Sequence, residues 1–219
     1  MNFRMKHQSS YLLILFVIIT LSCCRKPDRL PYYNEPDFTP TFLGKEDVAR
    51  NITHTIAPFQ FVNQHSKIIN QKIIAGKIHV ANFMFTSCGS ICPVMTRHMT
   101  LVQNAFLNNP EVILLSYSVM PWIDDVSTLK KYADDNNITS PQWHLLTGKR
   151  SEIYTLARKS YFAEEDLGFT RDSTEFLHTE HIILADRDLH IRGVYNGTLQ
   201  LEAEQLIKDI ALLMKENQK

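Results

Sequence analysis

Cys88 and Cys92 are the residues of this chain best suited to do chemistry. They are the two cysteines that remain once the first thirty residues are set aside, and three residues separate them. If the stretch between them forms a helical or turn-like loop, both sulfurs face the same side, because positions i and i+4 share a helix face. Two thiolates placed in this way can close a disulfide or chelate one metal ion. A purely structural disulfide is the alternative, although a loop this short removes little entropy from the unfolded chain.

The pattern around the two cysteines predicts a junction between a strand and a helix. Residues 78–85 are rich in Val, Ile and Phe, which is typical of a buried strand. From Pro93 to about Leu107 the apolar residues recur at steps of three and four, and proline suits the first turn of a helix. A helix N-terminus carries partial positive charge, which stabilises thiolate over thiol. The cysteines are therefore expected to form a redox-active or metal-binding pair.

The remaining segments predict one α/β domain. Strands or helices are expected at 56–61, 67–74, 111–119, 125–136, 143–147, 151–161, 181–186, 190–195 and 199–216. This order predicts a thioredoxin-like sandwich with a mixed central sheet, an N-terminal hairpin extension and an inserted helix. The cysteines lie where the first central strand meets its helix, as in thioredoxins.

A third metal ligand has to come from elsewhere in the chain, because two sulfurs leave a metal ion undercoordinated. His178 precedes the expected strand 181–186, at a place that faces the cysteine loop in thioredoxins and normally carries a proline there. Imidazole with two thiolates suits copper or zinc. His181 is the rival and is expected on the opposite face of the strand. The other histidines of the domain are read as ordinary core or surface residues: His54, His65, His79, His98 and His144.

The first fifty residues read as an export signal and a tether. A basic start is followed by an apolar run over 11–21, which is shorter than the ~20 residues that a spanning helix needs. Cys23 or Cys24 follows directly and resembles the lipidated cysteine of a bacterial lipobox. We expect a signal peptide at 1–23, a flexible tether at 24–51 and the folded domain at 52–217. Lipidation would hold the domain on the outer side of a bacterial membrane.

The charge of the chain gives no indication of a nucleic-acid partner. Lys and Arg together number 23, as do Asp and Glu, and the charges are scattered along the chain. Nucleic-acid binding normally requires a basic face. The pattern is that of an ordinary solvated surface.

Several motifs together resemble the Sco/SenC family. The stretch Phe83-Met-Phe-Thr-Ser-Cys-Gly-Ser-Ile-Cys-Pro is similar to the family signature, with Gly89 in place of its usual proline. Ser116-Tyr-Ser-Val-Met-Pro-Trp-Ile-Asp is similar to the family's Ser-x-Asp-Pro-x-x-Asp turn, with Met120 replacing the first Asp and Asp124 keeping the second. Leu177-His178-Thr179 falls on the family's Asp-His-Ser/Thr, which carries the histidine ligand.

This resemblance implies a copper protein of respiratory-enzyme assembly. It implies one copper ion, Cu(I) or Cu(II), held by Cys88, Cys92 and His178. The implied partner is subunit II of cytochrome c oxidase or a related respiratory oxidase, which would receive copper or have its cysteines reduced. Such a protein is a metallochaperone and not a turnover enzyme. The alternative is a periplasmic thiol-disulfide oxidoreductase for which copper is incidental.

Overall fold

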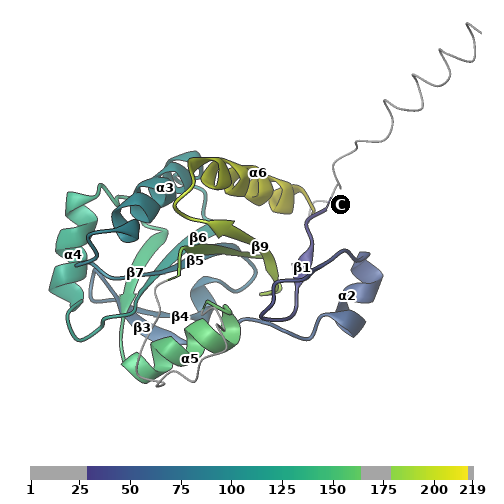
Figure 1. Cartoon of the computed structure of the whole chain (residues 1–219), viewed down its shortest axis with the longest axis horizontal. Helices are drawn as coiled ribbons and strands as arrows, with labels where there is room; N and C mark the ends of the chain where they lie inside the picture. The colour runs from purple at the N-terminus through teal and green to yellow at the C-terminus, as the bar shows by residue number, and fades with distance from the viewer. Residues whose placement is uncertain (1–28, 164–178, 217–219) are drawn as a thin grey trace, which may run out of the picture.

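One mixed sheet of nine strands forms the centre of the domain (Figure 1). The computed structural model describes residues 29–163 and 179–216. The strand order is β2-β1-β9-β8-β5-β6-β7-β3-β4. The strands are β1 (Tyr32–Tyr33), β2 (Pro40–Thr41), β3 (Gln60–Asn63), β4 (Ile68–Asn70), β5 (Ile78–Met84), β6 (Val112–Ser118), β7 (Trp143–Thr147), β8 (His181–Ala185) and β9 (Ile191–Asn196). Strands β5, β6 and β7 are parallel, and every other pairing is antiparallel.

Helices cover both faces of this sheet (Figure 1). They are α2 (Lys45–Asn51), α3 (Ile91–Ala105), α4 (Val126–Asp135), α5 (Arg150–Ser160) and α6 (Gln200–Glu216), with a short 3-10 turn at Gln71–Ile73. The thioredoxin-like fold expected from the sequence is confirmed, as is the predicted edge hairpin, formed by β3 and β4. Among the described residues, no helix is both long and apolar enough to cross a bilayer.

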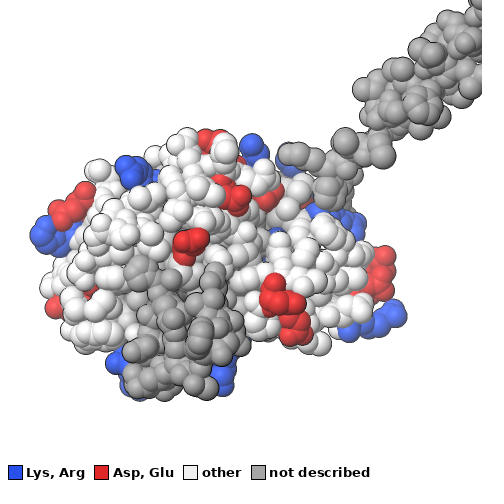
Figure 2. All heavy atoms as spheres, in the orientation of Figure 1, with Lys and Arg blue, Asp and Glu red and all other residues white. Residues whose placement is uncertain are grey.

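The central strands β5 and β6 are buried along their whole length, which explains their nearly continuous apolar sequences. Successive side chains of β5 point to opposite faces. Ala81 and Phe83 join the core under α5, whereas Val80 joins the core under α3 and α6. Acidic and basic side chains are interspersed on the face of the molecule shown in Figure 2.

Three chain segments leave the sheet at one common edge, which we call the cysteine edge. Met84 ends β5 and pairs with Ser118, which ends β6. On the other side of β5, strand β8 begins after Glu180, whose carbonyl accepts a hydrogen bond from the N–H of Gly197, just beyond β9. The segments after β5, β6 and β9 therefore start side by side at this edge.

Residues 30–51 differ from the flexible tether predicted from the sequence. Strand β1 pairs with β2 and with β9, and α2 contributes Val48 to a small core with Tyr32. The buried guanidinium of Arg192 donates hydrogen bonds to the carbonyls of Leu30 (2.8 Å) and Pro31 (3.0 Å). These contacts are between residues far apart in sequence, so local composition gave no sign of them.

Arg192 is expected to contribute strongly to stability, because it also pairs with Asp186 at 3.0 Å and Glu216 at 3.1 Å and lies over the ring of Tyr32. Arg192→Met leaves those carboxylates and carbonyls without their donor, and should lower the free energy of unfolding by about 3 kcal/mol. Urea unfolding measures this loss. The matched control is Lys130→Met, which removes an exposed pair with Asp134 and should cost under about 0.5 kcal/mol. Equal losses in the two variants would contradict the role of Arg192.

Candidate metal centre

Cys88 and Cys92 lie together at the start of α3, directly beyond the end of β5. Cys92 is the second residue of the helix, which begins at Ile91, two residues earlier than the sequence predicts. Both are free thiols, 7% and 2% exposed, and they pack against Met84. The two side chains are within hydrogen-bonding reach of each other. The two predicted cysteines therefore lie side by side as free thiols.

The environment of Cys88 favours its thiolate. Burial by itself would raise the pKa of Cys88, but the N–H groups of Cys92, Ser90 and Ile91 and the thiol of Cys92 outweigh that effect and lower it. These N–H groups belong to the start of α3, where a helix leaves its first donors unpaired. The sequence prediction of a thiolate stabilised by a helix N-terminus agrees with this environment at Cys88.

Cys92 behaves in the opposite way. Burial raises its pKa to about 12, and the charges of Cys88 and Asp124 act in the same direction. Only the N–H of Phe85 opposes this shift appreciably. The pair therefore consists of one thiol that ionises readily and one that keeps its proton at neutral pH, a difference that the spacing of the two cysteines does not reveal.

Asp124 fastens the loop that carries the cysteines to the neighbouring loop. Its fully buried carboxylate accepts hydrogen bonds from the N–H of Thr86 (3.1 Å), the hydroxyl of Thr86 (2.5 Å) and the hydroxyl of Ser118 (2.5 Å). The sequence shows Asp124 as part of the turn after β6, but nothing local indicates that it reaches across to Thr86. Asp124 is thus a positioning residue for the cysteine loop.

Gly89, where the family carries proline, needs neither a special backbone conformation nor extra space. Its φ is not positive, and a Cβ built on it would meet nothing within 4 Å. Ser87 and Ser90 beside it are exposed. The residues of the loop between the two buried cysteines are therefore partly exposed to solvent.

The predicted third ligand, His178, lies outside the described residues, so its placement stays a prediction. Its rival His181 does not face the cysteines. It lies on β8 with its ring edge-on to Phe38 at 5.5 Å, on the α5 side of the sheet, whereas the cysteines lie with Met84 on the other side.

Four other histidines of the domain have hydrogen-bond partners of their own. His54 pairs with the carbonyl of Ser160, His79 with the hydroxyl of Tyr161, and His98 with the carbonyl of Gly197. His144 pairs with the side chain of Asn63. Burial lowers the pKa of both His79 and His144 to about 4, so they are neutral core residues at pH 7.

Within the described residues, one group of three metal-ligand side chains is close enough to hold an ion, and it does not include the cysteines. Asp186, Asp188 and His190 form it at the turn between β8 and β9. The carboxylate of Asp186 already accepts from the N–H groups of Asp188 and His190 and from Arg192. These side chains therefore serve to hold the turn between β8 and β9 in place.

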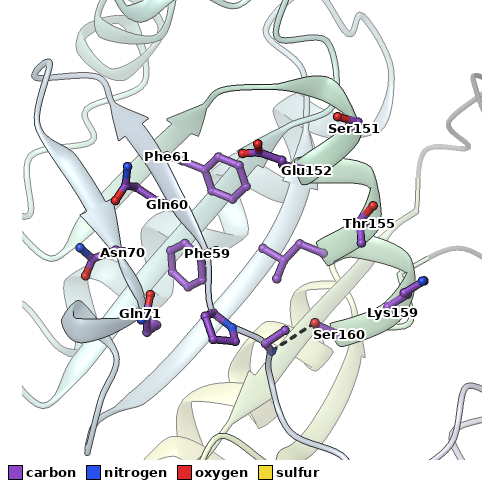
Figure 3. A pocket seen from close by; sticks show the side chains of 13 residues that line it. Phe59, Gln60, Phe61, Asn70, Gln71, Ser151, Glu152, Thr155, Lys159 and Ser160 are labelled. Carbon is purple, nitrogen blue, oxygen red and sulfur yellow. Dashed lines mark hydrogen bonds between the residues drawn. The ribbon is translucent and has the colours of Figure 1, made fainter.

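A cavity of about 630 Å³ lies between the β3–β4 hairpin and α5, away from the cysteine loop (Figure 3). Phe59, Phe61 and Leu156 form its apolar wall, and amide, hydroxyl and charged side chains, the last from Glu152 and Lys159, line most of the rest. The N–H of Ala57 donates to Ser160 at one end. No cysteine lines it, so this cavity is not the metal centre.

A dithiol between a central strand and its helix, on a mixed sheet covered on both faces, defines a thioredoxin-like thiol protein. The family model described as SCO1/SenC matches residues 48–215. The chain belongs to this SCO1/SenC family, as the sequence motifs suggest.

Three relatives illustrate the similarity. The chain is 31% identical over 169 residues to the SCO1 protein homolog of Bacillus subtilis, covering 76% of this chain and 86% of that one. The structure of BsSco, a member of the Sco family of cytochrome c oxidase assembly proteins with a disulfide switch, is 31% identical with a TM-score of 0.62 and covers 74% and 94% of the two chains. Bradyrhizobium japonicum ScoI with copper bound is 25% identical with a TM-score of 0.56, covering 72% and 98%.

The difference between the two thiols predicts that alkylation is selective. A thiol with a pKa of about 12 is ionised in only on the order of one molecule in 100,000 at pH 7. Because the thiolate is the nucleophile, iodoacetamide should label Cys88 more than about 100-fold faster than Cys92. Peptide mass mapping after short pulses between pH 5 and 9 measures both rates. The Cys88 rate should level off at a lower pH than that of a free thiol, and preferential labelling of Cys92 would refute the assignment.

Asp124→Asn is expected to loosen the cysteine loop. The amide NH₂ cannot accept all three donors, so a buried donor loses its partner at a cost of about 2 kcal/mol in unfolding free energy. Removing the charge should also lower the pKa of Cys92. Asp125→Asn is the matched control, because Asp125 caps α4 and Asn caps a helix equally well. Urea unfolding measures the first effect, and the alkylation assay measures the second. An unchanged rate of Cys92 alkylation would contradict the assigned influence of the Asp124 charge on that thiol.

Proposed function

We propose that the chain is a metallochaperone that carries one copper ion on Cys88, Cys92 and His178 and delivers it to the copper centre of a respiratory cytochrome c oxidase, with subunit II as the receiving chain. The observation that carries this proposal is the reduced dithiol at the start of α3 in a member of the SCO1/SenC family. The copper-bound ScoI of Bradyrhizobium japonicum and the oxidase-assembly role of BsSco's family support it.

The donors suit copper as cargo. Thiolate sulfur and imidazole nitrogen are the soft and borderline ligands that copper prefers. Copper would leave by ligand exchange, in which an acceptor thiolate binds the ion while a cysteine of this chain lets go. Gly89 and Ser90, exposed between the two cysteines, are where such an acceptor would make its first contact.

A thiol-disulfide oxidoreductase is the second candidate, and the contrast between the two thiols favours it. The Cys88 thiolate would attack one sulfur of a client disulfide, forming a mixed disulfide and releasing a client thiolate. Cys92 would then lose its proton and attack the Cys88 sulfur. This second step releases the client as a dithiol and leaves a Cys88–Cys92 disulfide, so two electrons pass to the client. The disulfide switch of BsSco supports this chemistry.

Lipid anchoring on the outer side of a bacterial membrane belongs to the same proposal. Cys23 and Cys24 lie outside the described residues, and the sequence pattern around them supports lipidation of one or the other. The anchor would keep the carrier at the membrane that holds its oxidase.

Copper titration of the reduced chain tests the metal site. We expect one ion per chain for the unchanged protein, measured by competition with a Cu(I) chelator. Cys88→Ser, Cys92→Ser and His178→Ala should each weaken binding by a factor of about 100 or more, since each removes one of three ligands.

His181→Ala is the matched control, because that ring faces the other side of the sheet, and it should leave copper affinity unchanged. If all three ligand substitutions left copper affinity unchanged while dithiol exchange required both cysteines, the oxidoreductase would become the better-supported function. If His181→Ala abolished binding and His178→Ala did not, the ligand assignment would be wrong.

A further inference from the structure

Exposed apolar side chains are concentrated at the cysteine edge. Among the described residues eight large hydrophobic side chains are exposed, and four of them follow the strands that end there: Trp122, Ile123, Leu199 and Leu201. Single exposed apolar residues scattered on a surface need no explanation, but a cluster at one place marks an interaction site. We call these four residues the apolar rim.

The sheet register places the rim on both sides of the cysteine loop. Met84 pairs with Ser118 on one side, and Gly197 donates a hydrogen bond to Glu180, which directly precedes β8, on the other side. Met84, Ser118 and Gly197 therefore lie in one row across the sheet. Cys88, Trp122 and Leu201 each come four residues beyond a member of that row. The apolar pair after β6 therefore lies on one side of the cysteine loop, and the pair after β9 lies on the other.

Trp122 is held in place although it is 57% exposed. Arg150 lies over its ring at 5.3 Å and over the ring of Tyr154 at the same distance. The hydroxyl of Tyr154 donates to the carbonyl of Val119, and Asp124 fastens the far end of the same loop. A large aromatic side chain that is already ordered loses little entropy on binding, and tryptophan is enriched at the energetic centres of interfaces.

We infer that the apolar rim is the docking surface for the copper-accepting protein, whose metal-binding loop presents an apolar side chain on each flank of its own thiols. This inference rests on the proposed function and adds the surface by which the partner is recognised. The partner has to reach the ion between the two sides of the rim, so it makes contact with both.

Two other occupants fit the structure less well. A lipid surface lying on both sides of the rim would cover the cysteine loop between them and stop exchange with an acceptor. The folded domain also begins at the opposite edge of the sheet, where the N–H of Leu30 contacts Glu216 at the far end of α6, so a membrane tether leaves from the side away from the rim. A second copy bound at the rim would block the cysteines in the same way.

The test compares copper transfer to a protein with copper removal by a small molecule. The copper-loaded full chain is mixed with the reduced soluble copper domain of an oxidase subunit II, or with bathocuproine disulfonate, which needs no docking surface. Trp122→Ser and Leu201→Ser should each slow transfer to the protein domain by roughly tenfold or more. Removal by the small chelator should keep its rate, and so should copper affinity. Phe42 is about as exposed as Trp122 (60%) and directly follows β2, the outermost strand of the sheet. The Phe42→Ser variant should therefore transfer copper at the normal rate.

The outcomes separate this inference from the proposed function. If the unchanged chain transfers copper and the rim variants match it, the rim is not the docking surface and the chaperone function stands. If the unchanged chain transfers no copper to the domain, the proposed function fails and the docking role fails with it. Rim-dependent binding to phosphatidylglycerol vesicles, or rim-dependent dimerisation in sedimentation, would also overturn the inference. Thermal unfolding of each variant checks that these surface changes leave the fold intact.

Discussion

The buried carboxylate of Asp124 accepts hydrogen bonds from the loop after β5 and from the end of β6, and the position of the cysteines depends on it. The two strands are paired, but pairing fixes only the strands and not the loops beyond them. By holding Thr86, Asp124 determines where the chain turns toward α3. The same residue ends the segment that presents Trp122 and Ile123, so the dithiol and the neighbouring apolar surface share one point of attachment.

The two thiols differ in pKa because they are four positions apart and the first residue of α3 lies between them. Cys88 lies before the helix, where the free N–H groups point toward its sulfur, whereas Cys92 is already within the first turn and in the core. The Cys88 sulfur is therefore ready to react as a thiolate, whereas Cys92 stays protonated until Cys88 has formed a bond to another group. Disulfide exchange uses this contrast, whereas holding a metal ion needs the two sulfurs side by side, so the same geometry supports two candidate activities.

The sequence predicted the elements whose patterns are local and missed the features that depend on distant contacts. The buried run of β5 and the period of α3 indicated the strand–helix junction, and the motif placed both cysteines there. The bond from Asp124 to Thr86 and the raised pKa of Cys92 depend on three-dimensional packing, which spacing cannot reveal. The ordered segment before residue 51 was read as a tether because its two-residue strands carry no periodic signal. It is held by Arg192, 161 residues after Pro31 in the chain.

The 17 residues of α6 also limit how far from a membrane the two cysteines could lie if the chain were lipid-anchored. The helix begins near the cysteine edge and ends at Glu216 beside Leu30, and at 1.5 Å per residue it is about 25 Å long. A lipid on Cys24, the nearer of the two candidate cysteines, would be six residues from Leu30, a reach of at most about 20 Å. A carrier anchored in this way would hold its cysteines at most about 45 Å above the bilayer surface, with the six residues extended and α6 upright. Client centres farther from the membrane than this would be out of its reach.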